Sequence, residues 1–189
     1  MRLITTVLLA FLCFIGTISA QEAGATFYTG LTFGSTKDIV INKPGQSQSG
    51  YLFGLDGRLN SGGLYFMLGG EYGKFDMMSQ EKLNITSGSK FSFFKGRAGM
   101  GFKLFGTDKI YLTSKAQASF DIVLNSDDAI LEASSYQIND GFLGAATGLG
   151  LNIYALFIEF EYEHGILNMY YQKPETTINF YTIKAGVKF

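Results

Sequence analysis

Cysteine, histidine and tryptophan are almost absent from this 189-residue sequence, which has one cysteine, one histidine and no tryptophan. The single cysteine, Cys13, lies in an N-terminal stretch that we expect to be removed, so the mature chain should contain no disulfide and no cysteine-based metal or catalytic site. One histidine cannot form a multi-histidine zinc site. The sequence therefore predicts no metal and no cofactor.

Charged residues are also few, and neither positive nor negative residues are in excess. The chain has 15 Lys and Arg against 16 Asp and Glu, a formal net charge of -1. The charges are scattered, which argues against a nucleic-acid partner, since such a partner requires a basic face. After residue 18, no run approaches the ~20 consecutive apolar residues that a transmembrane helix needs. A chain of this kind can cross a membrane only as a closed β-barrel.

The one long apolar run lies at the N-terminus. A short basic start, Met1 and Arg2, precedes an apolar stretch over residues 3–18, and small residues end it at Ala20. This arrangement is typical of a secretory signal peptide and predicts cleavage after Ala20. We expect residues 1–20 to be a signal peptide and residues 21–189 to form one barrel domain, because about 170 residues suit one domain better than two.

Eight segments of the remaining chain alternate between apolar and polar residues, as strands with one apolar face do. Their connections are alternately short turns and long polar loops, the pattern of outer-membrane barrels with turns in the periplasm and loops outside the cell. The predicted segments cover residues 26–34, 50–59, 64–75, 91–104, 110–124, 142–153, 156–164 and 177–189.

Within these segments, charged residues avoid the apolar positions, and the exception is Lys74, near an outer end. The clearest segment is 156–164, whose apolar residues alternate with Glu159, Glu161 and Glu163. A soluble lipocalin-like barrel would turn the apolar face inward. Eight strands enclose an interior only just filled by side chains, and the apolar positions supply too many large groups to fit there. We therefore predict that the apolar face contacts lipid and that the charges lie in the lumen.

The last segment, 177–189, carries a resemblance to known proteins. It alternates and ends on an aromatic residue, and so resembles the closing strand of the small outer-membrane β-barrel families, the OmpX and OmpA-type transmembrane domains. The resemblance implies an all-β fold, an eight-stranded antiparallel up-and-down transmembrane β-barrel, monomeric in the bacterial outer membrane in contact with lipid and lipopolysaccharide. In these families the closing strand is read by the barrel-assembly machinery. The corresponding residues here are Tyr181, Ile183, Val187 and Phe189.

The inward charges form the first candidate site. Acids and bases that nearly balance in a narrow interior should pair, because an unpaired buried charge costs several kcal/mol. Three glutamates at alternating positions repel one another unless cations lie opposite, so we expect Arg97 or a lysine to reach them. The predicted lumen network consists of Asp56, Arg58, Glu71, Lys95, Arg97, Lys103, Lys115, Asp121, Glu159, Glu161, Glu163 and Lys184.

Two further sets of residues are predicted at the membrane boundaries and in the loops. Aromatic girdles are expected at the outer rim (Tyr51, Tyr72, Tyr162) and at the inner rim (Phe102, Tyr154, Phe157, Phe189). Loop charges could pair with lipopolysaccharide phosphates or bind divalent cations, or could simply be solvated. They are Lys37, Lys43, Lys74, Lys82 and Lys90, and Asp127, Asp128, Glu132 and Asp140.

Three functions are compatible with the sequence. The first is a non-enzymatic membrane protein with a charge-plugged lumen and outward loops, serving envelope integrity or surface interaction. The second is a narrow ion or small-solute channel. The third is a lipid A-modifying enzyme, since lipid A deacylases use an outward-facing histidine and serine. His164 is predicted to face outward, but the sequence after it lacks the His-x-Ser-Asn pattern of those enzymes.

Overall fold

The structure is a computed structural model that describes residues 22–36, 48–61, 63–77, 89–126, 139–168 and 177–189. The predicted signal peptide and its cleavage after Ala20 lie outside the described residues, as do Lys37, Lys43, Lys82, Asp127, Asp128 and Glu132. Within the described ranges, none of the chain forms a helix long and apolar enough to cross a membrane.

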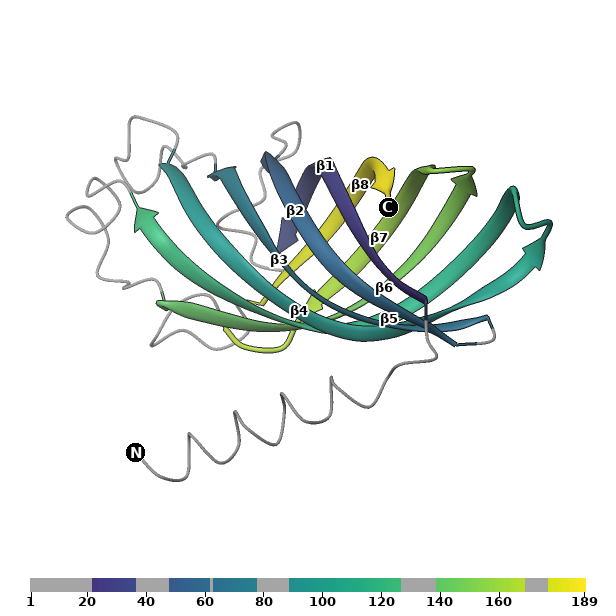
Figure 1. Ribbon diagram of the computed structural model, residues 1–189. Coiled ribbons are helices and arrows are strands. Elements are labelled where there is room, and N and C mark those ends of the chain that lie inside the picture. The colour runs from purple at the N-terminus through teal and green to yellow at the C-terminus, as the bar shows by residue number, and fades with distance from the viewer. Residues whose placement is uncertain (1–21, 37–47, 62, 78–88, 127–138, 169–176) are drawn as a thin grey trace, which may run out of the picture.

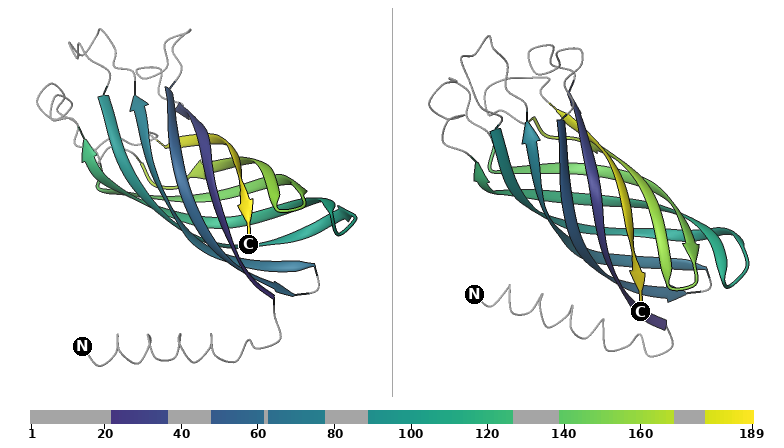
Figure 2. Two further views of the ribbon diagram at one scale, coloured as in Figure 1. Left: turned by 45° about the horizontal axis from the view of Figure 1, so that its top comes forward. Right: turned by 90° about the horizontal axis from the view of Figure 1, so that it is seen from above.

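Eight antiparallel strands form a closed barrel in which sequence neighbours are also spatial neighbours (Figures 1 and 2). The predicted fold is confirmed, and each strand covers most or all of its predicted segment. The strands are β1 Glu22–Thr36, β2 Gln48–Ser61, β3 Leu64–Met77, β4 Ser89–Gly106, β5 Ile110–Ser126, β6 Gly141–Ile153, β7 Leu156–Gly165 and β8 Ile178–Lys188.

The barrel closes where the first strand meets the last. Thr26 of β1 pairs with Lys188 of β8 at one end of this ladder, and Thr36 pairs with Ile178 at the other. Beyond β8, Phe189 N–H donates to the carbonyl of Ala25 at 2.8 Å, and Ala25 N–H donates to that of Phe189 at 3.1 Å. Because every strand has two hydrogen-bonded neighbours, the sheet presents no open edge.

The turn between β4 and β5 is shorter than the sequence predicts. β4 extends to Gly106, whereas a turn over residues 105–109 was expected. The ladder pairs Lys103 with Thr113 and then Phe105 with Leu112, so one extra residue forms a β-bulge in β4. The bulge keeps β4 paired for two further residues. Gly106, at φ 127°, then makes the turn in a conformation that glycine adopts without strain.

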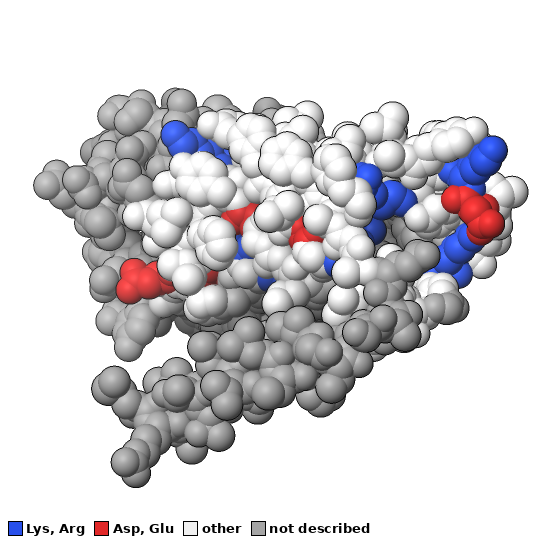
Figure 3. Space-filling view, in the orientation of Figure 1, with Lys and Arg blue, Asp and Glu red and all other residues white. Residues whose placement is uncertain are grey.

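Most apolar side chains of the strands face outward, and most of their charged side chains face the lumen. Phe53 and Ile183 are about half exposed, at 48% and 51%, whereas Glu161 and Lys184 are 2% and 1% exposed. The described surface in Figure 3 is mostly uncharged, and a group of charged side chains lies at the end that carries the β4–β5 turn. This arrangement contradicts the soluble alternative, in which the charges would lie in water.

The residues predicted for the aromatic girdles face outward except at one position. Tyr51, Tyr72, Phe102, Tyr154 and Phe189 are exposed on the outer wall, and Tyr162 is partly exposed there. Phe157 instead points into the lumen and is only 4% exposed. Its position in β7 has the same parity as the three glutamates, so the strand geometry turns it inward. There it packs edge-on against Tyr28, with ring centroids 6.2 Å apart.

Candidate functional site: the charged lumen

Alternation along the strands brings the charged side chains into the barrel, and glycines leave room for them. A Cβ added at Gly54 would overlap the ring of Tyr28, and one added at Gly144 would overlap the carboxylate of Glu163. A small barrel has space for long side chains only where the facing positions are small. The glycines on the inward parity therefore determine where long polar groups can cross the lumen.

Arg97 of β4 is the centre of the largest group of ion pairs. Its NH2 nitrogen contacts Asp56 Oδ2 at 2.6 Å and Oδ1 at 2.8 Å. Its NH1 nitrogen contacts Glu71 Oε1 at 2.6 Å and Glu161 Oε2 at 3.3 Å. These carboxylates come from β2, β3 and β7, so one guanidinium connects strands on different sides of the lumen. The planar fork of donors on arginine suits such multiple pairing.

Two lysines complete this group around Glu161. Lys184 Nζ lies 2.5 Å from Glu71 Oε1 and 2.9 Å from both carboxylate oxygens of Glu161. Lys115 Nζ lies 2.6 Å from Glu161 Oε2 and 2.5 Å from Glu159 Oε1. We call the seven residues the Arg97 cluster: Asp56, Glu71, Arg97, Lys115, Glu159, Glu161 and Lys184.

A second, smaller group lies nearer the loop end, and we call it the Lys95 cluster. Lys95 Nζ lies 2.5 Å from Glu163 Oε2 and 3.4 Å from Asp121 Oδ1. The Ser119 hydroxyl donates to the other oxygen of Glu163 at 2.7 Å. The expectation that Arg97 or a lysine reaches Glu159, Glu161 and Glu163 is confirmed.

Two residues of the predicted network lie apart from both clusters. Arg58 points into the lumen and is 9% exposed, and it takes part in none of the salt bridges between side chains that the structure describes. Lys103 lies at the turn end and pairs with Asp108 of the β4–β5 turn at 3.1 Å. The physical reason is their position along the barrel axis. Parity assigns both residues to the inner face, but they lie closer to the turn end of their strands than most acidic residues of the two clusters do.

Sequence reasoning missed two uncharged residues that form hydrogen bonds with the Arg97 cluster. The Tyr28 hydroxyl lies 3.2 Å from both Asp56 Oδ1 and Glu71 Oε1, and the Gln117 amide donates to Glu161 Oε2 at 3.0 Å. Tyr28 lies in the one early segment without charges, so no charge pattern marked its inward face. The available signal was the alternation of the strand: Phe27 and Leu31 face outward, so Tyr28, at the opposite parity, faces inward.

An apolar layer lies in the lumen at the loop end, beyond the Lys95 cluster. The Phe75 and Phe180 rings meet edge to face at 5.3 Å. Lys95 Nζ lies 5.1 Å from the Phe180 ring centroid, so the layer borders directly on the charged interior. We call these residues the loop-end cluster: Phe75, Phe93, Phe142, Ile178 and Phe180.

His164 lies on the outer wall near the loop end, as its parity predicts. Its Nδ1 lies 2.7 Å from Asn179 Oδ1, and its cross-strand neighbours are Ala145 and Asn179. Its hydrogen-bond partner is thus an amide on β8. Over the described ranges, no three His, Cys, Asp or Glu residues are grouped so that they could hold a metal ion.

No protein-family model and no curated protein matches this sequence. The assignment of the fold therefore rests on comparison with solved structures. Neisserial surface protein A superposes with a TM-score of 0.57 at 11% identity, over 90% of this chain and 100% of that chain. The attachment invasion locus protein of Yersinia pestis, solved with the heparin analogue sucrose octasulfate, gives a TM-score of 0.54 at 13% identity over 89% and 99% of the two chains.

The fold is that of the small outer-membrane β-barrels. The barrel has an exterior suited to lipid and an interior that holds its charges, as barrels of this fold do. The outer membrane enzyme PagL shares the fold, with a TM-score of 0.50 at 13% identity over 87% of this chain and 98% of that chain. Identities this low show the fold alone, so the function has to be argued from the site.

The residues predicted to serve as an assembly signal lie along one face of the closing strand. Tyr181, Ile183 and Phe189 are exposed on the lipid side, and Val187 is partly exposed there. Tyr181 and Tyr162 lie 5.2 Å apart between ring centroids. The face is continuous from the outer part of β8 to the turn end of the barrel.

Proposed function

We propose that this protein is a non-enzymatic integral outer-membrane barrel whose lumen is closed and whose loops act outside the cell, in envelope integrity or surface interaction. One observation carries the proposal: the Arg97 cluster connects carboxylates from β2, β3 and β7 across the lumen. The loop-end cluster adds an apolar layer above it.

The energetics of buried ion pairs favour a closed lumen over a channel. A permeating ion would have to separate Arg97 from its three carboxylates in a region without bulk water. Removing one partner of a buried ion pair costs about 3–5 kcal/mol, because the other charge is left uncompensated. That cost recurs at Lys115 and Lys184, so no single rotamer change opens a path.

Conductance measurements test this proposal against a narrow ion or small-solute channel. The mature protein is reconstituted into planar bilayers, and the expected result is no steady conductance above that of the protein-free bilayer. A steady conductance that changes when Glu161→Gln is introduced would instead establish the channel. A conductance unaffected by that variant would be attributed to leakage at the barrel wall.

The lipid A-modifying enzyme is retained as a second candidate because PagL, an outer-membrane enzyme, shares the fold. The pairing of His164 with an amide supports the non-enzymatic proposal, since the lipid A deacylases use a serine and an acid. Mass spectrometry of lipid A from cells with and without the protein decides between them. An altered acylation pattern that His164→Ala abolishes would establish the enzyme.

We also propose the partners that a protein of this kind meets in the envelope. Lys74 is exposed on the outer wall near the loop end, where its ammonium suits a lipopolysaccharide phosphate. The barrel-assembly machinery would read the exposed face of β8. The protein would act as a monomer after cleavage at Ala20, which N-terminal sequencing and light scattering of the purified protein test.

A further inference from the structure

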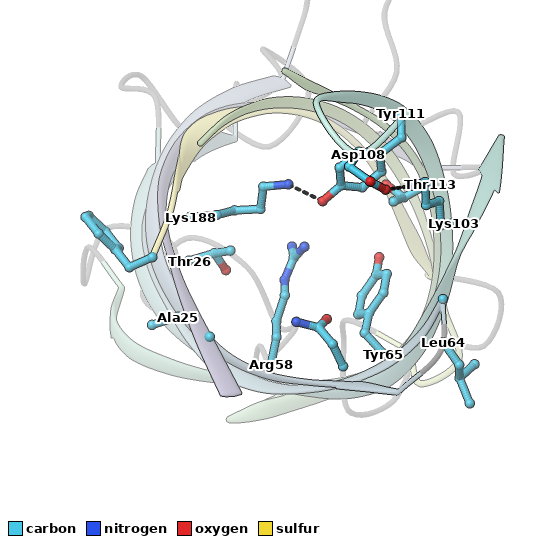
Figure 4. A pocket seen from close by; sticks show the side chains of 14 residues that line it. Ala25, Thr26, Arg58, Leu64, Tyr65, Lys103, Asp108, Tyr111, Thr113 and Lys188 are labelled. Carbon is cyan, nitrogen blue, oxygen red and sulfur yellow. Dashed lines mark hydrogen bonds and ion pairs between the residues drawn. The ribbon is translucent and has the colours of Figure 1, made fainter. Parts of the chain in front are cut away.

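A pocket of about 520 Å³ opens at the turn end of the lumen (Figure 4). The view shows Arg58, Tyr65 and Lys188 reaching toward its middle from different parts of the wall. Its volume is in the range of small-molecule sites. The Arg97 cluster fills the lumen beyond it, so this turn-end pocket opens toward the turns, the side expected to face the periplasm.

Arg58 is the deepest cation of the pocket, and it takes part in none of the ion pairs between side chains that the structure describes. The nearest acid along β2, Asp56, gives both carboxylate oxygens to Arg97. The guanidinium of Arg58 instead lies over two rings, 5.0 Å from the centroid of Tyr65 and 5.6 Å from that of Phe157. Arg58 is also nine-tenths buried, so water compensates its charge only from the mouth of the pocket.

Two lysines add positive charge at the same mouth. Lys188 Nζ donates to two neutral acceptors, the Tyr111 hydroxyl at 2.6 Å and Asn152 Oδ1 at 2.7 Å. Lys103 pairs with Asp108, whose side chain is fully exposed on the turn. The side chains that line the pocket thus carry three positive charges against one negative charge at the rim.

Two buried polar atoms in the wall of the pocket have no hydrogen-bond partner among the described residues. They are Oγ1 of Thr26 and Nε of Arg58, and both side chains are at least nine-tenths buried. Buried polar groups are normally satisfied by protein or by a bound molecule. The hydrogen-bonding capacity of the wall of this cationic pocket is therefore not fully used by the described residues.

We propose that the turn-end pocket binds a phosphate group presented from the periplasmic side. A phosphate monoester offers several acceptor oxygens with more than one negative charge, which matches the guanidinium, the ammonium and the hydroxyls arranged around the pocket. The group belongs either to a free phosphate ester or to a lipid headgroup that ends in a phosphate monoester. The proposal does not depend on whether the lumen conducts.

The test is calorimetric titration of the refolded mature protein in an uncharged maltoside detergent, at constant ionic strength set with chloride. The two probes are glycerol 3-phosphate and dihexanoyl phosphatidic acid, which present the same phosphate monoester without and with acyl chains. Saturable binding of the free ester identifies a soluble ligand, and binding of the lipid alone identifies a headgroup. Absence of binding by both probes overturns the proposal.

Matched variants locate the site. Arg58→Gln is expected to weaken binding about tenfold or more, as the loss of a charge-assisted hydrogen bond does. Lys109→Gln is the control, because Lys109 stacks on Tyr154 at 5.8 Å and does not line the pocket. Heat-modifiability on a gel confirms that each variant is folded, and Lys188→Gln replaces Arg58→Gln if the latter does not fold. Equal affinity in the folded variant and the parent protein overturns the proposal.

Discussion

The two ends of the lumen are built differently. At the loop end, Phe75, Phe93 and Phe180 form an apolar layer, and the neighbouring charges of the Lys95 cluster are paired. At the turn end, Arg58 and Lys188 line an open pocket, and neither takes part in an ion pair between side chains that the structure describes. Side chains therefore fill the lumen in the middle and at the loop end. The turn end is open, and its cations face a pocket.

The largest expected effect comes from removing the charge that connects the middle of the lumen. Arg97→Met leaves Asp56 and Glu71 buried with fewer cations, and should destabilise the barrel by about 3–5 kcal/mol. Urea unfolding in lipid vesicles, followed by circular dichroism, measures it. A loss below 1 kcal/mol would mean that the Arg97 cluster is solvated, and would weaken the contrast with the turn end.

The next effect tests the apolar layer at the loop end. Phe180→Ala removes the ring that packs edge-on against Phe75 and should cost about 3 kcal/mol through lost contacts and a cavity. The control is Phe53→Ala on the outer wall, where lipid chains can fill the space. The same unfolding assay should rank Phe180→Ala as clearly more destabilising. Equal losses would show that the layer is not tightly packed.

A smaller effect compares two buried arginines directly. Arg58→Met should change stability by about 1 kcal/mol or less, because Arg58 loses only its contacts with Tyr65 and Phe157 and no salt bridge. Arg97→Met under identical conditions is the matched comparison. A loss at Arg58 as large as that at Arg97 would reveal a neutralising partner and remove the distinction between the two regions.

The smallest effect is expected at the rim of the pocket. Lys103→Gln breaks the pair with Asp108, whose side chain is fully exposed. Exposed pairs often contribute nothing measurable, so the midpoint of unfolding should stay within error of the parent protein. A shift that disappears at high salt would show that this pair does stabilise the β4–β5 turn.

The fold could be predicted from the sequence because alternation fixes which face each residue occupies. The glutamates of β7, interrupted by Phe160 and Tyr162, determine the inner face of that strand without any knowledge of its neighbours. The same reasoning applied strictly would have placed Phe157 inside, since it shares the parity of Glu159. Its aromatic character suggested a girdle, and the pleat of the strand overrides that expectation.

The pairing inside the lumen could not be predicted to the same extent. Parity gives a face but not a height, and the tilt and stagger of the strands decide which residues meet across the barrel. Arg97 of β4 contacts Glu161 of β7, although those strands are not neighbours. For the same reason the balance of acids and bases could not reveal that Arg58 and Lys103 lie apart from the acidic residues.

The hydrogen bonds between β1 and β8 join the two strands that are farthest apart in sequence. The ring is therefore incomplete until the final strand has been delivered, and before then both β1 and the most recently added strand expose unpaired backbone groups. Contacts of such long sequence separation form slowly. A half-made barrel therefore keeps two open edges that can pair with other chains, and this exposure lasts until β8 is in place.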